Sequence, residues 1–75
     1  MNLEKFLTAF AEQLDDTDAS LITPDCEFHD LDEWSSLTGM AIIAMVRTEF
    51  DKSITGKEIR GCNTIEDLYN LVNNK

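Results

Sequence analysis

The residues with the clearest chemical potential are two adjacent serines, Ser35 and Ser36, placed where a long polar stretch meets an apolar helical pattern. A serine at a helix start can cap the helix, because its Oγ accepts a hydrogen bond from a backbone N–H of the first turn. A hydroxyl in that turn can also carry a phosphate ester, since the helix dipole and unpaired N–H groups stabilise negative charge there. Either serine could therefore be an N-cap or a covalent attachment point.

Other reactive side chains do not form a recognisable enzyme or zinc site. His29 is the single histidine of the chain, and a hydrolase built on Ser36 would also need an orienting group and an oxyanion hole. We expect His29 to lie in a loop with carboxylates or water as partners. Cys26, His29 and Cys62 lack the paired spacing of a structural zinc site. Both cysteines are therefore predicted to be small packing residues.

A partial calcium-loop pattern is also present in the first half of the chain. Asp16, Asp18, Ser20 and Glu27 fall at the first, third, fifth and twelfth positions of such a loop. Leu21 stands where the loop needs glycine for its sharp turn. We interpret the match as accidental and predict no metal site.

The charge balance limits the classes of partner. The chain has 75 residues, with 15 acidic against 6 basic side chains and a formal net charge of −9. Nucleic-acid binding needs clustered lysine and arginine, so we expect no nucleic-acid partner. The acidity suits docking onto proteins with basic surfaces, or it simply keeps a small protein soluble. Both interpretations remain open.

Length and hydropathy predict a single small domain over residues 1–75. No stretch approaches the ~18 apolar residues of a membrane span, and the start lacks a basic leader before an apolar run. We therefore expect a soluble, cytoplasmic, monomeric protein with reduced thiols and no membrane insertion.

The apolar spacing predicts the first helix and the loop that follows it. The helix has Asn2 as its N-cap and ends at the polar run of residues 15–18. Residues 15–35 then form a connection much longer than usual, which needs apolar anchors. The candidate anchors in this loop are Leu21, Ile22, Phe28, Leu31 and Trp34.

The second half of the chain predicts three further helices. Residues 36–50 form one helix, with an apolar stripe made by Ile42, Ile43, Val46 and Phe50. Thr55 and Glu58 fit a capping box for a short helix over residues 56–60, which Gly61 can end, and Thr64 and Asp67 resemble a second capping start. The inner face of the last helix carries Ile65, Leu68, Tyr69 and Val72. The predicted fold is all-α, a small antiparallel bundle of three main helices plus one short helix, with a long first loop.

These residues resemble the acyl carrier protein family over nearly the whole chain. The run Glu-Trp-Ser-Ser-Leu-Thr at residues 33–38 carries the resemblance, together with residues 43–51, Ile54 and residues 64–68. The family signature is Asp-Ser-Leu at the start of the second helix. Ser36 and Leu37 match it, and Ser35 stands where the aspartate is usual.

The resemblance implies that Ser36 is esterified with 4'-phosphopantetheine, donated from coenzyme A by a magnesium-dependent phosphopantetheinyl transferase. Ser35 is the alternative attachment residue, and its presence in place of aspartate is expected to affect the efficiency of modification. The thiol of the arm would carry an acyl group as a thioester, and the protein itself would catalyse nothing. The acyl chain would tuck between helices, in a pocket bordered by Met40, Ile43, Ile54 and Ile59.

The resemblance also implies partners, namely the transferase and acyl-activating, ketosynthase or acyltransferase enzymes. The expected partner-binding residues are Leu37, Thr38, Met40, Ala41, Ala44 and Arg47. Fatty-acid carriers are usually acidic on this face, whereas here the acids gather in the loop, at Asp25, Glu27, Asp30, Asp32 and Glu33. We therefore expect a carrier for a specialised lipid, polyketide or related pathway.

Two alternatives remain at this point. A peptidyl (aminoacyl) carrier is a close variant, because the sequence does not identify the cargo. A non-carrying interaction module would keep the same bundle and bind a partner through a face made by Met40, Ala44 and Met45.

Overall fold

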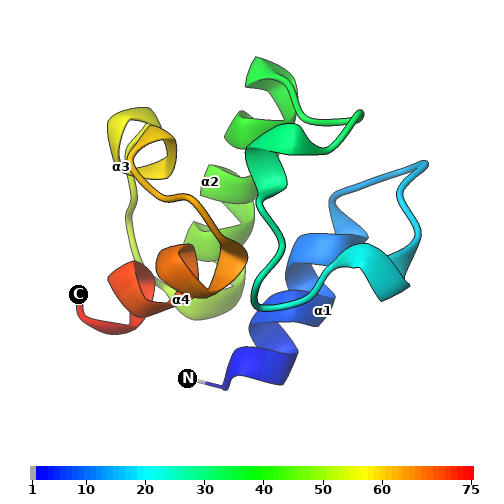
Figure 1. Ribbon diagram of the computed structural model, residues 1–75. Helices are drawn as coiled ribbons and strands as arrows, with labels where there is room; N and C mark the ends of the chain where they lie inside the picture. The colour runs from blue at the N-terminus through cyan, green and yellow to red at the C-terminus, as the bar shows by residue number, and fades with distance from the viewer. Residues whose placement is uncertain (1) are drawn as a thin grey trace.

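A computed structural model describes residues 2–75, and in this part of the chain the regular elements are all helical (Figure 1). The bundle contains α1 (Leu3–Glu12), α2 (Ser36–Phe50), α3 (Gly56–Arg60) and α4 (Ile65–Asn73), with short 3₁₀ turns at Ala19–Leu21 and Phe28–Asp30. Helix α1 contacts α2 and α4, and α2 contacts α3. The predicted all-α bundle of three longer helices and one short helix is confirmed.

Local capping explains where most helices begin. Asn2 caps α1, as predicted. Thr55 and Glu58 form a reciprocal capping box at α3, and Thr64 and Asp67 form another at α4. Each box satisfies two backbone N–H groups that a helix start would otherwise leave unpaired. The described helices include none that is long and apolar enough to cross a membrane.

The core forms where the inner faces of α1, α2 and α4 meet the long loop. Its fully buried side chains are Phe6, Phe10, Phe28, Ile42, Val46, Ile65, Leu68 and Val72. Phe28 reaches from the loop into this core, where its ring lies 5.8 Å from Phe10 of α1 and 4.9 Å from Trp34 (centroid distances). The predicted anchors Phe28 and Trp34 are thus confirmed.

The prediction that Leu21 anchors the loop in the core is wrong. Its side chain is 56% exposed, whereas the neighbouring Ile22 is buried. The cause is the tight 3₁₀ turn at Ala19–Leu21, which Asp18 caps. Such a turn directs successive side chains to different sides, so that only one of these two neighbours reaches the core.

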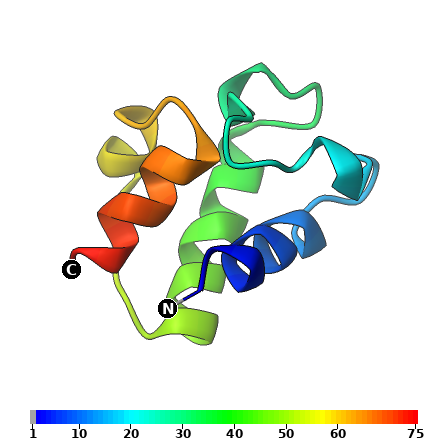
Figure 2. The same ribbon diagram turned by 60° about the horizontal axis from the view of Figure 1, so that its bottom comes forward.

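The long loop runs beside α1 and leads to the start of α2 (Figures 1 and 2). On the way it passes the start of α4, where the carbonyl oxygens of Pro24 and Cys26 accept hydrogen bonds from the N–H groups of Glu66 and Ile65 at 2.9 and 3.0 Å. These two bonds give the free N–H groups of α4 partners on the loop. The loop is therefore part of the bundle.

The two ends of the loop are joined by the carboxylate of Glu33. One oxygen accepts from the N–H of Asp15 at 2.6 Å, and the other accepts from the N–H of Asp16 at 2.9 Å and from the hydroxyl of Thr17 at 2.7 Å. The Thr17 hydroxyl and then the Asp15 N–H lower the pKa of Glu33 below its usual range, because they bind its ionised form. From the sequence, Glu33 was expected to be one of the surface acids of the loop. In the structure, its carboxylate holds the two ends of that loop together.

The lowered pKa of Glu33 predicts a pH-dependent contribution to stability. The folded state favours the ionised carboxylate, so the stabilisation is fully present above the unfolded pKa of about 4.3. It is lost as the pH falls through the lower folded value. We expect Glu33→Gln to have a lower Tm than the wild type at neutral pH, and the difference to shrink below about pH 4.

Thermal unfolding followed by circular dichroism from neutral to acidic pH checks this expectation. Glu27→Gln is the matched control, since Glu27 is exposed in the same loop and its side chain makes no capping hydrogen bond at the turn it precedes. Equal Tm values for the two variants at neutral pH would contradict the role of Glu33.

Candidate functional site

The two adjacent serines have different environments at the start of α2. Ser35 is the N-cap in extended conformation, and its Oγ accepts a hydrogen bond from the Thr38 N–H at 3.3 Å. Ser36 is the first helical residue, and its side chain is exposed. Its hydroxyl makes no hydrogen bond within the described part of the chain. The capping use is thus confirmed for Ser35, while the hydroxyl of Ser36 is free for chemistry.

Thr38 fixes the corner at which this helix begins. Its hydroxyl donates to the backbone carbonyl oxygen of Glu33 at 2.8 Å, in addition to the bond from its N–H to Ser35. A few residues away, the indole of Trp34 lies 3.6 Å from the position that a Cβ would take on Gly39. Thr38, expected from sequence to contact partners, therefore also has a structural role.

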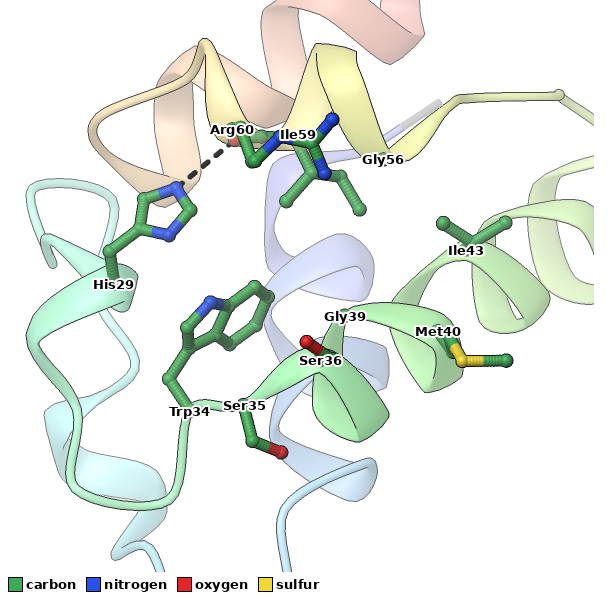
Figure 3. Close-up of a pocket in the computed structure, with 10 residues that line it drawn as sticks. All are labelled: His29, Trp34, Ser35, Ser36, Gly39, Met40, Ile43, Gly56, Ile59 and Arg60. Carbon is green, nitrogen blue, oxygen red and sulfur yellow. Dashed lines mark hydrogen bonds between the residues drawn. The ribbon is translucent and has the colours of Figure 1, made fainter.

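Ser36 lies at a mainly apolar cavity of about 430 Å³ between the end of the loop, the first turns of α2, and α3 (Figure 3). The residues that line it are His29, Trp34, Ser35, Ser36, Gly39, Met40, Ile43, Gly56, Ile59 and Arg60. Three residues of the predicted acyl pocket, Met40, Ile43 and Ile59, are among them. Ile54 is not among the lining residues; its side chain packs in the core.

His29 joins the long loop to the end of α3. Its Nε2 lies 3.1 Å from the carbonyl oxygens of both Ile59 and Cys62. Carbonyl oxygens only accept, so Nε2 must carry the proton and donate to both. The imidazole ring also packs 4.3 Å from the ring of Phe28 and 5.4 Å from that of Trp34 (centroid distances).

The prediction that carboxylates hold His29 is therefore wrong, because its Nε2 contacts backbone carbonyl oxygens. The residues that hold it lie 30 and 33 positions further along the chain. Within residues 2–75 there is also no group of three or more histidine, cysteine, aspartate and glutamate side chains arranged to hold a metal ion.

Both cysteines are free thiols and pack where the sequence predicted. Cys62 is buried in the core, and Cys26 is half-buried against it. Burial, followed by the nearby Asp25 carboxylate, raises the pKa of the Cys26 thiol. Burial and then Asp67 raise the pKa of the Cys62 thiol. Both therefore stay protonated at neutral pH.

The first turns of α2 expose apolar side chains beside Ser36. Leu37 is 78% exposed and Met40 is 64% exposed. Of the other expected partner-binding residues, Ala44 and Arg47 are exposed and Ala41 is half-buried.

The prediction that Met45 belongs to an exposed partner-binding face is wrong. It is only 4% exposed because it points from α2 into the core. The face proposed for a non-carrying interaction module is therefore reduced to Met40 and Ala44.

Comparison with known families gives one match. A family model described as a phosphopantetheine attachment site matches residues 4–72. Searches of curated proteins and of solved structures gave no match. The matched range covers the two serines, the cavity and almost all of the four helices.

The contacts of His29 predict that its removal loosens α3. We expect His29→Ala to lower the free energy of unfolding by about 1–2 kcal/mol, because two carbonyl oxygens lose a donor. His29→Gln should recover part of this loss, since a glutamine amide can also donate. Urea denaturation measures the free energy, and amide hydrogen exchange locates the change.

The increase in hydrogen exchange should be larger in α3 than in α1. Asp30→Ala, in the same 3₁₀ turn, is the control. Uniform acceleration across the four helices would contradict a local role for His29.

Proposed function

Because this chain belongs to the phosphopantetheine attachment site family, we propose that it is an acyl carrier protein whose 4'-phosphopantetheine is attached to Ser36. Carriers of this family hold the group covalently on a serine. The observation that favours Ser36 is its exposed, unbonded hydroxyl at the cavity, whereas the Oγ of Ser35 caps α2. Leu37 after it completes the part of the family signature that this chain retains.

The surroundings of Ser36 fit such a group. Its hydroxyl lies in the first turn of the 15-residue helix α2, where the helix dipole and free N–H groups favour a phosphodiester. When bound, the arm supplies a thiol that carries an acyl group as a thioester. Carrier domains of this kind are generally not catalysts. Tethering raises the effective concentration of the cargo at each partner enzyme.

The cavity beside Ser36 is the proposed acyl-binding pocket. Met40, Ile43 and Ile59 supply its aliphatic wall, and the indole of Trp34 closes the side nearest the loop. Apolar chains gain free energy when they leave water for such a wall, at roughly 25 cal/mol per Å². Ile54 would support this pocket from the core and would not contact the cargo.

We propose that partner enzymes dock on the exposed start of α2. Leu37 and Met40 are the centre of this surface, with Thr38, Ala41, Ala44 and Arg47 around them. The transferase and acyl-activating, ketosynthase or acyltransferase enzymes would use it in a specialised lipid, polyketide or related pathway in the cytoplasm. The support for a specialised pathway is the apolar character of this face, since the acids lie mainly in the loop.

Two other functions stay as candidates. A peptidyl (aminoacyl) carrier would use the same serine, and a pocket of this composition accepts apolar aminoacyl groups as well. A non-carrying interaction module is supported by the exposure of Leu37 and Met40, and by Ser35 at the position where carriers usually have aspartate.

Intact mass after incubation with coenzyme A and a broad-specificity phosphopantetheinyl transferase tests the attachment residue. We expect the wild type to gain one phosphopantetheine and Ser36→Ala to gain none. Ser35→Ala should still be modified, although it loses a cap and about 1 kcal/mol of stability.

The remaining outcomes separate the alternatives. A shift that survives in Ser36→Ala but disappears in Ser35→Ala moves the site to Ser35. No shift with cognate and promiscuous transferases favours the interaction module.

The apolar docking surface predicts weak salt dependence. Between about 0.05 and 0.5 M salt, we expect Kd for the transferase to change less than about threefold, because screening acts on charges and not on apolar contacts. Leu37→Ala should weaken binding about tenfold or more, as expected for burial of a leucine.

Surface plasmon resonance over this range of salt measures both effects. The control is Arg47→Gln, which removes a charge from the same face and should change Kd little. A steep loss of affinity with salt would contradict the apolar interface and, with it, the specialised pathway.

A further inference from the structure

Arg60 places a positive charge on the wall of the cavity that contains Ser36. It is the single lysine or arginine among the ten lining residues. Arg60 lies on α3, which forms the wall across the cavity from the first turns of α2 (Figure 3). Arg60 is exposed to solvent, and its guanidinium is the positive charge that an anion in the cavity would meet.

The guanidinium lies over Gly56, at the other end of α3. A Cβ placed on Gly56 would lie 3.3 Å from Nη1 of Arg60. Residues four apart occupy the same face of a helix, and long side chains point back toward its N-terminus. Since Gly56 also lines the cavity, the guanidinium lies along the cavity wall. A larger residue at position 56 would press on it.

The charge of Arg60 is not neutralised by the chain itself. Within residues 2–75, Arg60 makes no ion pair or hydrogen bond through its guanidinium. The acid nearest in sequence, Glu58, is already engaged by Lys75 at 2.9 Å and by the N–H of Thr55 at 3.0 Å. The donors of Arg60 are available to a ligand.

We propose that Arg60 binds an anionic oxygen of the group tethered to Ser36. This inference rests on the proposed function. Two sources share this chemistry, the phosphodiester of the arm and a carboxylate at the end of a carried acyl chain. The planar guanidinium donates two parallel hydrogen bonds to either anion. Arg60 would thus be a specificity residue that favours a negatively charged group in the cavity.

The test compares the thermal stability of four forms of the protein: apo, loaded with the free thiol, loaded with a butyryl thioester, and loaded with a succinyl thioester. Butyryl and succinyl have the same number of carbons, but only succinyl carries a carboxylate. The variant is Arg60→Gln. The control is Lys57→Gln, which removes the same charge from α3 at an exposed residue that does not line the cavity. Intact mass confirms the loading of every sample.

Stabilisation by Arg60 should appear as a rise in Tm of about 2–8 °C in the wild type and in Lys57→Gln, and it should be lost in Arg60→Gln. If the rise appears between the apo and free-thiol forms, the anion is the phosphodiester. If it appears only between the butyryl and succinyl forms, the anion is the carboxylate. Arg60→Lys keeps the positive charge but cannot donate two parallel hydrogen bonds from a planar group. This variant should therefore retain only part of the rise in Tm. Equal behaviour of Arg60→Gln and Lys57→Gln in all four forms would overturn the proposal.

A second measurement does not depend on loading. The apo protein is titrated with pantetheine 4'-phosphate while the amide resonances of Gly56 and Ile59 are followed by NMR. We expect saturable shifts in the wild type that weaken at high salt and are absent in Arg60→Gln. A wild type that cannot be loaded but shows these shifts would refute the carrier function alone. A loaded wild type without any dependence on Arg60 would refute only this inference.

Discussion

The geometry of the site depends on the contacts of one residue, Glu33. Its carboxylate binds the start of the long loop at residues 15–17, and its backbone carbonyl accepts the hydroxyl of Thr38 in α2. A loop of this length loses considerable conformational entropy when its ends are brought together. Glu33 makes that closure at the point where the chain enters α2. The position of Ser36 relative to the cavity therefore depends on the loop being closed.

Under the proposed function, the two serines have separate tasks that one hydroxyl could not perform together. A hydroxyl that accepts from the helix N–H groups is held in place, whereas an attachment point must be reached by an enzyme. The Oγ of Ser35 accepts the capping hydrogen bond, whereas the exposed hydroxyl of Ser36 makes no hydrogen bond within the described residues. Aspartate, which is usual in the family at this position, is as good an N-cap as serine. Compared with an aspartate at this position, Ser35 therefore keeps the N-cap of α2 and lacks only the negative charge.

The parts of the structure that depend on neighbouring residues could be predicted from the sequence. The bounds of α2 and α3 follow from a cap and a capping box that lie within a few residues of each helix start. Two of the expected pocket residues, Met40 and Ile43, line the cavity for a similar reason, since residues three apart share a face of α2, whereas Ile59 comes from α3. Leu21 and Met45 were misjudged because an apolar side chain next to another gives no sign of which one faces the core.

The parts that depend on distant residues could not be predicted. The carboxylate of Glu33 binds groups 16–18 positions away, and His29 binds carbonyl oxygens 30 and 33 positions away. Nothing in the spacing of these residues marks them as partners. The place of Arg60 in the cavity wall likewise follows from how α3 packs against α2, which the sequence of α3 alone does not determine.

The packing of the two cysteines has a consequence for the proposed role as a carrier of thioesters. A thioester is attacked by thiolates, and a thiol with a raised pKa supplies very little thiolate at neutral pH. Cys26 and Cys62 both have raised pKa values. In the proposed carrier, the two thiols would therefore be poor nucleophiles toward the thioester on the arm.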